Sequence, residues 1–465
     1  MLLVRLAECA RQIHLENIPA EAIDNAKMAL LDTVGVTLAG SREDCVTFVR
    51  KAAGAFASGN STLFGDTATI SPLDATLVNG TAAHALDFDD CSNTMGGHPS
   101  APIVPALYAL AERQKASGAR LLEAYVAGFE VETKIGRAVN FTHYEKGWHP
   151  TSTLGTFGAA AACAHLLELP VDRFAAALSL AASMASGLKA NFGTMAKPYH
   201  VGHCSRNGLL AALLAAEGMT ANLGVLEEPQ GFFNVYNGPG TFDADRLFAG
   251  FAAPFDLIDP GVAFKQHPCC ASTHPALDAL IRIMRENNLS ADQVRSIRSW
   301  THPRRLKHTN RPDPKSGLDA KFSVQYVLAR VALEGIVRLE HFSDAAINDQ
   351  AVRSFMTRID ASPHPDAIMD TTEHFFADVR VTTHDGDVFD AHVDRPLGRD
   401  RQHPLPPMAL EQKFRDCAGL VLDGECVLAL EHAFLHIENQ NNISDVSHLM
   451  RNGILHDIPL RRMGE

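Results

Sequence analysis

The 465-residue chain lacks the short motifs that mark several large enzyme classes. It contains no G-x-G-x-x-G, no G-x-x-x-x-G-K-[ST], no H-E-x-x-H and no G-x-S-x-G. These motifs place glycines at phosphates, histidines on zinc or a serine on a sharp turn. Their absence removes the usual support for nicotinamide, nucleotide, zincin and α/β-hydrolase chemistry.

The cysteines are few and lack a recognisable spacing. The chain has nine, with no C-x-x-C pair, and Cys269 and Cys270 are adjacent. Neither a disulfide framework nor a zinc ribbon has this spacing. We therefore expect reduced thiols that are mostly structural.

Excess positive charge and long apolar runs are also missing. The formal net charge is −13, and no run of five Lys or Arg residues occurs, which argues against a nucleic-acid partner. No stretch of 18 apolar residues occurs, so no membrane span is predicted. The apolar start MLLVRLAECARQIHLE carries Arg5, Glu8 and Arg11, unlike a signal peptide. These features predict a cytoplasmic protein.

The first half of the chain has helical periodicity. The length exceeds the roughly 250 to 300 residues at which one core stops growing, so we expect two domains. In EAIDNAKMALLDTVGVTLAG, apolar residues share one helical face before Gly40 ends the helix: Ile23, Ala26, Leu30, Val34 and Leu38. Dense Ala and Gly further along favour closely packed helices.

The pattern changes after about residue 265. RSIRSWTHP and FFADVRVTTHDGDVFDAHVDRP alternate with period two, and Asp385-Gly386 between two such runs indicates a hairpin. The predicted fold is mainly α with an α+β part. A discontinuous all-helical domain spans residues 1–265 and 399–465, and a smaller inserted α+β domain spans 266–398.

Three His-Pro elements precede predicted helices: His98-Pro-Ser, His149-Pro-Thr and Thr-His274-Pro. Proline suits a first helical turn, and Ser or Thr can cap it. Each histidine would then lie at a helix N-terminus, where the backbone favours anions. One such element is ordinarily only a capped helix start, whereas three together suggest a cradle for a polyanion.

The stretch NFGTMAKPYHVGHCSRNG gathers four cationic or titratable side chains within ten residues: Lys197, His200, His203 and Arg206. Glycines at 193, 202 and 208 would let the backbone approach a ligand. The alternative is a solvated basic loop, which the apolar helices on both sides disfavour.

The stretch NGTAAHALDFDD ends in three carboxylates around one phenylalanine. On a helix, His84, Asp87 and Asp90 would share a face and Asp89 would point elsewhere. Carboxylates held close together resist joint ionisation, so one would have a raised pKa suited to acid or base work. The alternative is an acid cluster at a helix end facing water.

A further pair, His432 and His436, has metal-ligand spacing without an obvious third ligand, and we predict no metal site.

The chain resembles the MmgE/PrpD family, which includes 2-methylcitrate dehydratase, cis-aconitate decarboxylase and iminodisuccinate epimerase. The likeness covers nearly the whole chain. It is carried by LLDTVGVTLAG, NGTAAHALDFDD, GHPS, GWHPTSTLGTFGAAAA, GTMAKPYHVGHCSRNG, FKQHPCCASTH and AKFSVQYVLARVALEG. It implies a homodimer with a cofactor-independent active site between a helical and an α+β domain.

The resemblance also implies which residues act. The catalytic positions would be Asp87, His98, His149, Lys197 and His274. We expect substrate contacts from His84, Thr151, His200, Arg206 and Lys265. The family's chemistry builds negative charge next to a substrate carboxylate, which Lys197 and His149 would stabilise.

The predicted function is therefore a lyase of the dehydratase or decarboxylase type acting on a small anionic di- or tricarboxylate. An epimerase or isomerase of a substrate such as iminodisuccinate is an alternative, because it uses the same residue types. A helical dimer that binds a metabolite without catalysis is a second alternative.

Overall fold

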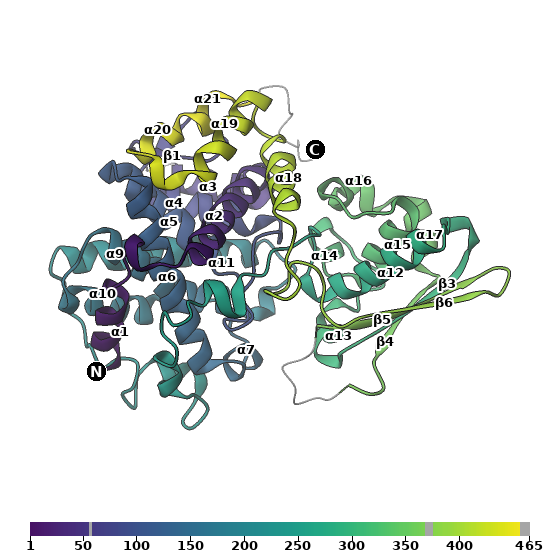
Figure 1. Cartoon of the computed structure of the whole chain (residues 1–465), viewed down its shortest axis with the longest axis horizontal. Coiled ribbons are helices and arrows are strands. Elements are labelled where there is room, and N and C mark those ends of the chain that lie inside the picture. Colours follow the sequence, from purple (N-terminus) through teal and green to yellow (C-terminus); the bar gives the residue numbers. More distant parts are fainter. Residues whose placement is uncertain (55–57, 368–374, 456–465) are drawn as a thin grey trace. The chain divides into compact units, whose positions relative to one another are not determined.

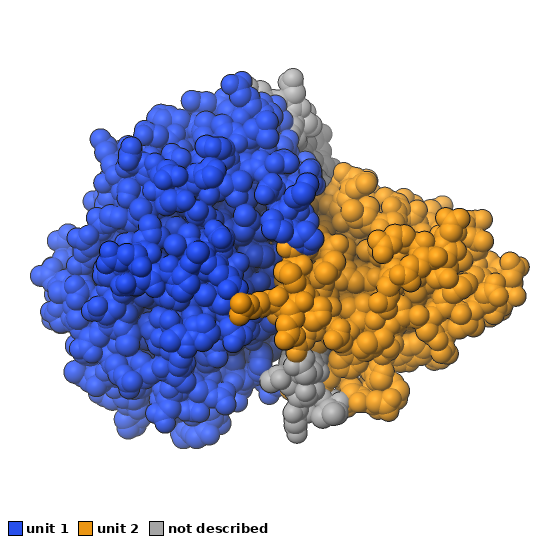
Figure 2. All heavy atoms as spheres, in the orientation of Figure 1, with its two compact units in different colours: residues 1–85, 89–264, 406–465 blue, residues 86–88, 265–405 orange. Residues whose placement is uncertain are grey.

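The computed structural model describes residues 1–54, 58–367 and 375–455. The chain divides into two compact units (Figure 2). Unit 1 comprises residues 1–85, 89–264 and 406–465, and unit 2 comprises residues 86–88 and 265–405. A three-residue segment, Leu86–Phe88, thus belongs to a different unit from the chain on either side of it.

Unit 1 is a helical assembly (Figure 1). Its helices are α1 (Leu2–Arg11), α2 (Ala20–Gly40), α3 (Asp44–Gly54), α4 (Pro72–Ala85), α5 (Ser100–Gln114), α6 (Gly118–Val139), α7 (Thr142–Glu145), α8 (Pro150–Thr153), α9 (Gly155–Leu166), α10 (Val171–Met184), α11 (Ala196–Ala216), α18 (Pro407–Ala418), α19 (Gly424–Leu435), α20 (Ile443–Ser447) and α21 (Leu449–Asn452). As predicted, α2 ends at Gly40.

Small residues let the central helices of unit 1 pack closely. Helix α11 packs against α4, α5, α9 and α10. A Cβ atom added at Gly80 of α4 would lie only 2.8 Å from Cα of Gly202 on α11. At Gly208 it would lie 2.4 Å from Cβ of Ala159 on α9. The predicted role of Gly202 and Gly208 in ligand approach is therefore wrong: both are helical residues at helix contacts.

The C-terminal helices pack onto the N-terminal part of unit 1. Lys413 of α18 forms a buried ion pair with Asp32 of α2, with Nζ 2.6 Å from Oδ1. Gly35, one turn along α2, makes room for Phe414: its added Cβ would lie 2.8 Å from the phenylalanine ring. One core, which includes Leu30, Phe157 and Phe434, joins both ends of the chain.

Unit 2 contains a four-stranded sheet in the order β4-β3-β5-β6. Its strands are β3 (Val294–Thr301), β4 (Ile359–Pro363), β5 (Ala377–Thr383) and β6 (Val388–Val393). β4 runs parallel to β3, whereas β5 runs antiparallel to both β3 and β6. The predicted hairpin at Asp385-Gly386 joins β5 and β6, and Gly386 has φ +95°.

Helices of unit 2 build a separate core on this sheet. They are α12 (His274–Glu286), α13 (Pro303–Thr309), α14 (Gly317–Ala320), α15 (Val324–Glu334), α16 (Asp344–Ile347) and α17 (Gln350–Met356). α12 packs against α15, β5 and β6. The core contains residues such as Leu277, Tyr326 and Val381. The predicted mainly helical fold with a small α+β part is confirmed.

Two details differ from the sequence-based prediction. The N-terminal region is not wholly helical, because β1 (Ser61–Thr62) and β2 (Thr69–Ile70) form a short antiparallel ladder. Strand β4 was not predicted, since its sequence IDASP lacks clear apolar alternation. Within the described residues, every helix is too short or too polar to cross a lipid bilayer.

Candidate functional site

The acid-rich stretch leaves the helix before its carboxylates. Helix α4 ends at Ala85, and Asp87 has φ +52°. In unit 2, Lys321 donates a hydrogen bond to the carbonyl of Leu86, and Lys265 Nζ donates to the carbonyl of Asp87 at 2.6 Å. The prediction that His84, Asp87 and Asp90 share a helical face is therefore wrong, because the three acids do not continue α4.

Asp89 is the acid that contacts the histidines of unit 1. Its Oδ2 lies 2.8 Å from Nδ1 of His84 and 3.1 Å from Nδ1 of His98. The prediction that Asp89 points elsewhere is wrong. The two imidazoles meet edge to face, with ring centroids 4.5 Å apart. The buried Asp89 and His84 and the partly buried His98 thus form a cluster, which we call the clasp.

Charge is unevenly distributed within the clasp. Burial raises the pKa of Asp89, but the two imidazoles outweigh burial and hold that pKa well below its usual value. Burial lowers the pKa of His84 to about 3; Asp89 opposes this shift, while Lys197 and His98 add to it. At neutral pH the clasp therefore contains an ionised carboxylate beside a neutral His84.

His149 extends this cluster from the start of α8. Its ring centroid lies 5.6 Å from that of His84, and its Nδ1 lies 3.3 Å from Nδ1 of His200. Burial, followed by the charges of His84 and Lys197, lowers the pKa of His149 well below its usual value. His149 is therefore neutral in the protein without substrate.

Lys197 lies in the first turn of α11 and is buried, with 3% of its surface exposed. Its Nζ lies 5.3 Å from the ring centroid of Phe192, which also packs edge-on against His149. The alternative of a solvated basic loop around Lys197 is not found, because α11 starts at Ala196 and carries all four polar residues singled out from the sequence. A buried ammonium next to neutral imidazoles favours an anion.

The remaining predicted contacts in unit 1 divide into two groups. Thr151 supports the site, since its Oγ1 accepts a hydrogen bond from the backbone N–H of His98 at 3.1 Å. His200 contacts His149 directly. Arg206 instead lies near His203, whose pKa is lowered by burial and then by the arginine charge. His203 in turn contacts Asn207.

The His-Pro elements do start helices, but their hydroxyls are not caps. α5 starts at Ser100, α8 at Pro150 and α12 at His274, each without a side-chain cap. The Ser100 hydroxyl and backbone N–H both donate to Asp90. The Thr273 hydroxyl donates to the carbonyl of Cys270. The hydroxyls therefore make contacts other than those that the capping prediction required.

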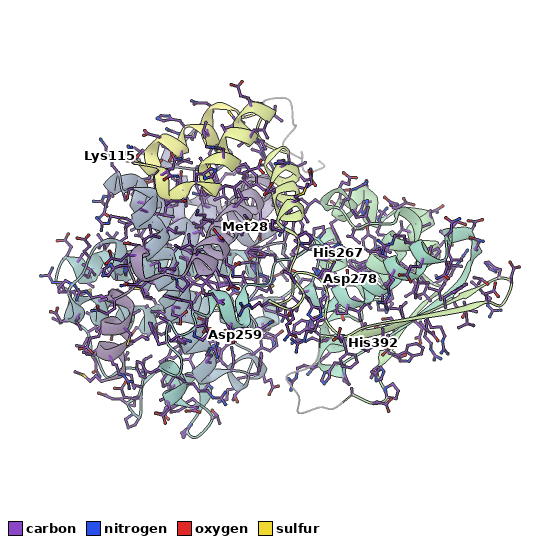
Figure 3. All side chains as sticks on the ribbon, viewed as in Figure 1. Met28, Lys115, Asp259, His267, Asp278 and His392 are labelled. Carbon is purple, nitrogen blue, oxygen red and sulfur yellow. The ribbon has the colours of Figure 1, made fainter. Side chains whose placement is uncertain are left out.

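Unit 2 contains a second set of titratable residues. Lys265 pairs with Asp87, with Nζ 3.3 Å from Oδ2, and both side chains are buried. His267 and Asp278 lie side by side in Figure 3, with Nε2 3.1 Å from Oδ1. The His267 ring packs edge-on against that of His274, with centroids 5.1 Å apart.

His274 itself is neutral. Its Nε2 donates to the carbonyl of Cys269 at 3.2 Å. Burial lowers the pKa of His274 well below its usual value, and the charges of His267 and Lys265 lower it further. Burial also raises the pKa of the neighbouring Cys269 thiol to about 12, so this cysteine is a protonated thiol at neutral pH.

Sequence reasoning missed three residues of these sets: Asp89, His267 and Asp278. Asp89 lies in the stretch NGTAAHALDFDD that we had selected. It was missed because we assumed that the helix continues through this stretch, which would place Asp90 and not Asp89 on the face of His84. His267 precedes Pro268 in FKQHPCC and thus repeats the His-Pro pattern, but the same pair follows at His302, His364 and His403, so the pattern does not single out His267. Asp278 lies on α12 with no distinguishing neighbour in sequence.

The clasp also resembles a donor set for a metal ion. One ligand atom from each of His84, Asp89 and His98 lies within 4.8 Å of the others. The electrostatic effect of Lys197 on His84 and His149, however, favours an anion over a cation here. Among the described residues, His432 and His436 lie with their tilted rings 4.7 Å apart, centroid to centroid, and belong to no such group of three donors.

These features define a class: proteins with a large helical unit and an α+β unit, whose buried histidines, carboxylates and lysines form acid–base sites. The chain belongs to the MmgE/PrpD family. Residues 4–245 match the MmgE/PrpD N-terminal domain, and residues 267–435 match the MmgE/PrpD C-terminal domain.

Characterised relatives extend over almost the whole chain. Cis-aconitate decarboxylase from Homo sapiens is 31% identical over 448 residues, which cover 92% of this chain and 90% of that protein. Cis-aconitate decarboxylase from Aspergillus terreus is 26% identical over 464 residues, 95% of this chain and 94% of that protein. The Mus musculus protein of the same name is 30% identical.

Proposed function

We propose that the protein is a cofactor-independent lyase that cleaves a bond next to a carboxylate of a small di- or tricarboxylate. Decarboxylation of a substrate like cis-aconitate is the reaction that we favour, because the human and Aspergillus terreus relatives are named for it. The predicted homodimer, cytoplasmic location and shared site between the two domains stay predictions.

The observation that carries this proposal is the buried Lys197 beside neutral imidazoles in unit 1. Its ammonium group lowers the pKa values of both His84 and His149, after the larger effect of burial. A substrate carboxylate at this position would pair with Lys197 and would accept a hydrogen bond from an N–H of His149. Such preorganised donors are commonly the largest catalytic contribution.

The proposed decarboxylation uses few protein groups. The C–C bond to one carboxylate breaks, CO₂ leaves, and the electron pair remains on the carbon, where it is delocalised into the neighbouring unsaturated carboxylate. Lys197 stabilises the charge that develops there. A histidine, His98 or His149, then delivers one proton to the carbon and is reprotonated by solvent. The reaction consumes one proton and releases one CO₂.

The predicted catalytic positions Asp87 and His274 belong to the same proposal. Lys265 holds Asp87 through both its backbone carbonyl and its carboxylate, so Asp87 is a fixed anion suited to orienting a proton carrier. We propose that Lys265 acts on the substrate chiefly by fixing Asp87. His200 and Thr151 support His149 and His98, and Arg206 is proposed to attract anionic substrate.

The test is proton NMR in D₂O with cis-aconitate, 2-methylcitrate, citrate and iminodisuccinate, each added separately to the purified protein. Decarboxylation or dehydration gives new vinylic or methylene signals. Deuterium entering an α-position without a new carbon skeleton would establish an epimerase instead. Binding of a substrate without any reaction would favour the non-catalytic alternative.

Lys197→Ala tests the residue that carries the proposal. We expect kcat to fall by roughly 10²- to 10³-fold, as for other electrostatic stabilisers of a transition state, with little change in Tm. Lys134→Ala is the matched control, because Lys134 is equally buried but pairs with Asp256 at 2.6 Å. It should lower Tm instead. Unchanged turnover in Lys197→Ala would contradict the site assignment.

A further inference from the structure

Both histidines of the clasp face the same carboxylate oxygen with the same ring atom. Nδ1 of His84 and Nδ1 of His98 lie 2.8 Å and 3.1 Å from Oδ2 of Asp89. An ionised carboxylate only accepts hydrogen bonds. Each Nδ1 must therefore carry a hydrogen to make its contact with Asp89.

This arrangement determines what the other ring nitrogen can do. In a neutral imidazole with Nδ1 protonated, Nε2 is an acceptor with a lone pair. In the described part of the chain, Nε2 of His84 is buried without a hydrogen-bond partner. A buried acceptor without a partner is costly, so Nε2 of His84 is the atom of this ring that can accept a hydrogen bond from a bound molecule.

We propose that Asp89 is the positioning residue of the site: it fixes His84 and His98 as Nδ1–H tautomers, so that both rings present Nε2 to the substrate. This inference rests on the proposed function for its catalytic consequence. The carboxylate also stabilises the imidazolium that forms when either Nε2 takes up a proton, which is the part that an aspartate plays behind a catalytic histidine. Asp89 acts through the two imidazoles and need not touch the substrate.

The neighbouring acid performs a structural task, which makes the two residues separable by experiment. Asp90 accepts hydrogen bonds from the backbone N–H and the hydroxyl of Ser100, at the start of α5. Burial raises the pKa of Asp90 well above its usual value. Asp90 therefore holds the start of α5 through Ser100, whereas Asp89 holds the two imidazoles.

The direct test is ¹⁵N NMR of the ¹⁵N-histidine-labelled protein without substrate, with His84→Gln and His98→Gln used to assign the signals. We expect both residues to show a protonated Nδ1 and an unprotonated Nε2. Protonation of Nε2 in either neutral ring would overturn the proposal. This result does not depend on the reaction, so it distinguishes failure of the inference from failure of the proposed function.

Asp89→Asn supplies the catalytic test. Both imidazoles face one oxygen, so the amide either turns its N–H₂ group toward both rings, which must then change tautomer, or keeps its oxygen there and loses the negative charge that stabilises an imidazolium. We expect kcat to fall by roughly 10²- to 10⁴-fold, with a smaller change in KM and a changed pH profile. Asp90→Asn is the matched control, because Asp90 contacts Ser100 at the start of α5, and it should retain turnover within a few-fold. Equal turnover and an unchanged pH profile in Asp89→Asn would overturn the role of Asp89.

Discussion

Burial controls the protonation of single residues in this protein. His84 and His149 have lowered pKa values chiefly because burial disfavours the charged imidazolium. The proposed reaction nevertheless needs a proton donor. A di- or tricarboxylate bound near Lys197 would add negative charge beside His149 and raise its pKa. His149 would then take up a proton from solvent when the substrate binds, and it would later deliver that proton to the substrate.

Proton uptake on binding tests this coupling. The pKa of His149 is low in the free protein and is expected to rise in the complex. At a pH between these two pKa values, binding of the substrate is therefore accompanied by uptake of a proton. The sign follows from linkage: affinity is highest at low pH and falls by up to about tenfold per pH unit as pH rises toward the pKa of the complex. Calorimetry at pH 6 with tricarballylate, in buffers of different ionisation enthalpy, measures this uptake.

Two variants make the result specific. His149→Asn should reduce the uptake. His143→Asn should not, because His143 is bound instead to Asn237 and Thr153, although burial lowers its pKa to about 4. Proton release, or equal uptake in the His149 variant, would contradict the coupling.

At the scale of elements, α11 connects packing with chemistry. Its first turn carries Lys197, and five residues later Gly202 lies against α4. An added Cβ at Gly202 would lie 2.2 Å from the carbonyl oxygen of Leu77 and 2.3 Å from Oγ1 of Thr81. The position of Lys197 therefore depends on Gly202, because only a residue without a side chain lets α11 pack this closely against α4.

Gly202→Ala should separate α11 from α4. We expect the free energy of unfolding to fall by roughly 1 to 3 kcal/mol, the usual range for overpacking, and turnover to fall because Lys197 moves. Gly424→Ala is the control: Gly424 begins α19, and its added Cβ would meet nothing within 4 Å. It should be neutral or slightly stabilising. Urea unfolding measures both, and equal stability of the two variants would contradict the packing argument.

At the scale of the whole molecule, unit 1 is assembled from both ends of the chain. Two ion pairs join α2 to C-terminal segments: Asp32 with Lys413, and Lys27 with Glu438, each with an N–O distance of 2.6 Å. They differ in burial, since the side chains of Asp32 and Lys413 are 1% and 6% exposed and those of Lys27 and Glu438 are 12% and 28% exposed.

This difference in burial predicts unequal effects on stability. Lys413→Ala should lower the free energy of unfolding by roughly 3 to 5 kcal/mol, because it removes one partner of a buried ion pair. Lys27→Ala should cost at most about 1 kcal/mol, because its pair is better solvated. Denaturant unfolding of both variants tests this, and a larger loss for Lys27→Ala would show that burial is not the deciding factor.

The sequence by itself determined the helical and α+β character, the hairpin at Asp385-Gly386 and the helix starts after His98, His149 and Thr273. These features depend on local periodicity, proline and turn residues, which act over a few positions of the chain. The motifs also identified His84, His98, His149 and Lys197, because rare titratable residues within apolar stretches are conspicuous in any fold.

Only the tertiary structure decided which aspartate meets the histidines. A continued helix would have placed Asp87 and Asp90 beside His84, but α4 ends at Ala85 and the segment Leu86–Phe88 is held by lysines of unit 2. The chain therefore changes direction, and Asp89 reaches both rings. Likewise, Gly202 serves helix packing and not ligand approach, since its neighbour is α4, more than a hundred residues earlier in the chain. Contacts of this kind depend on distant segments meeting, which no local pattern encodes.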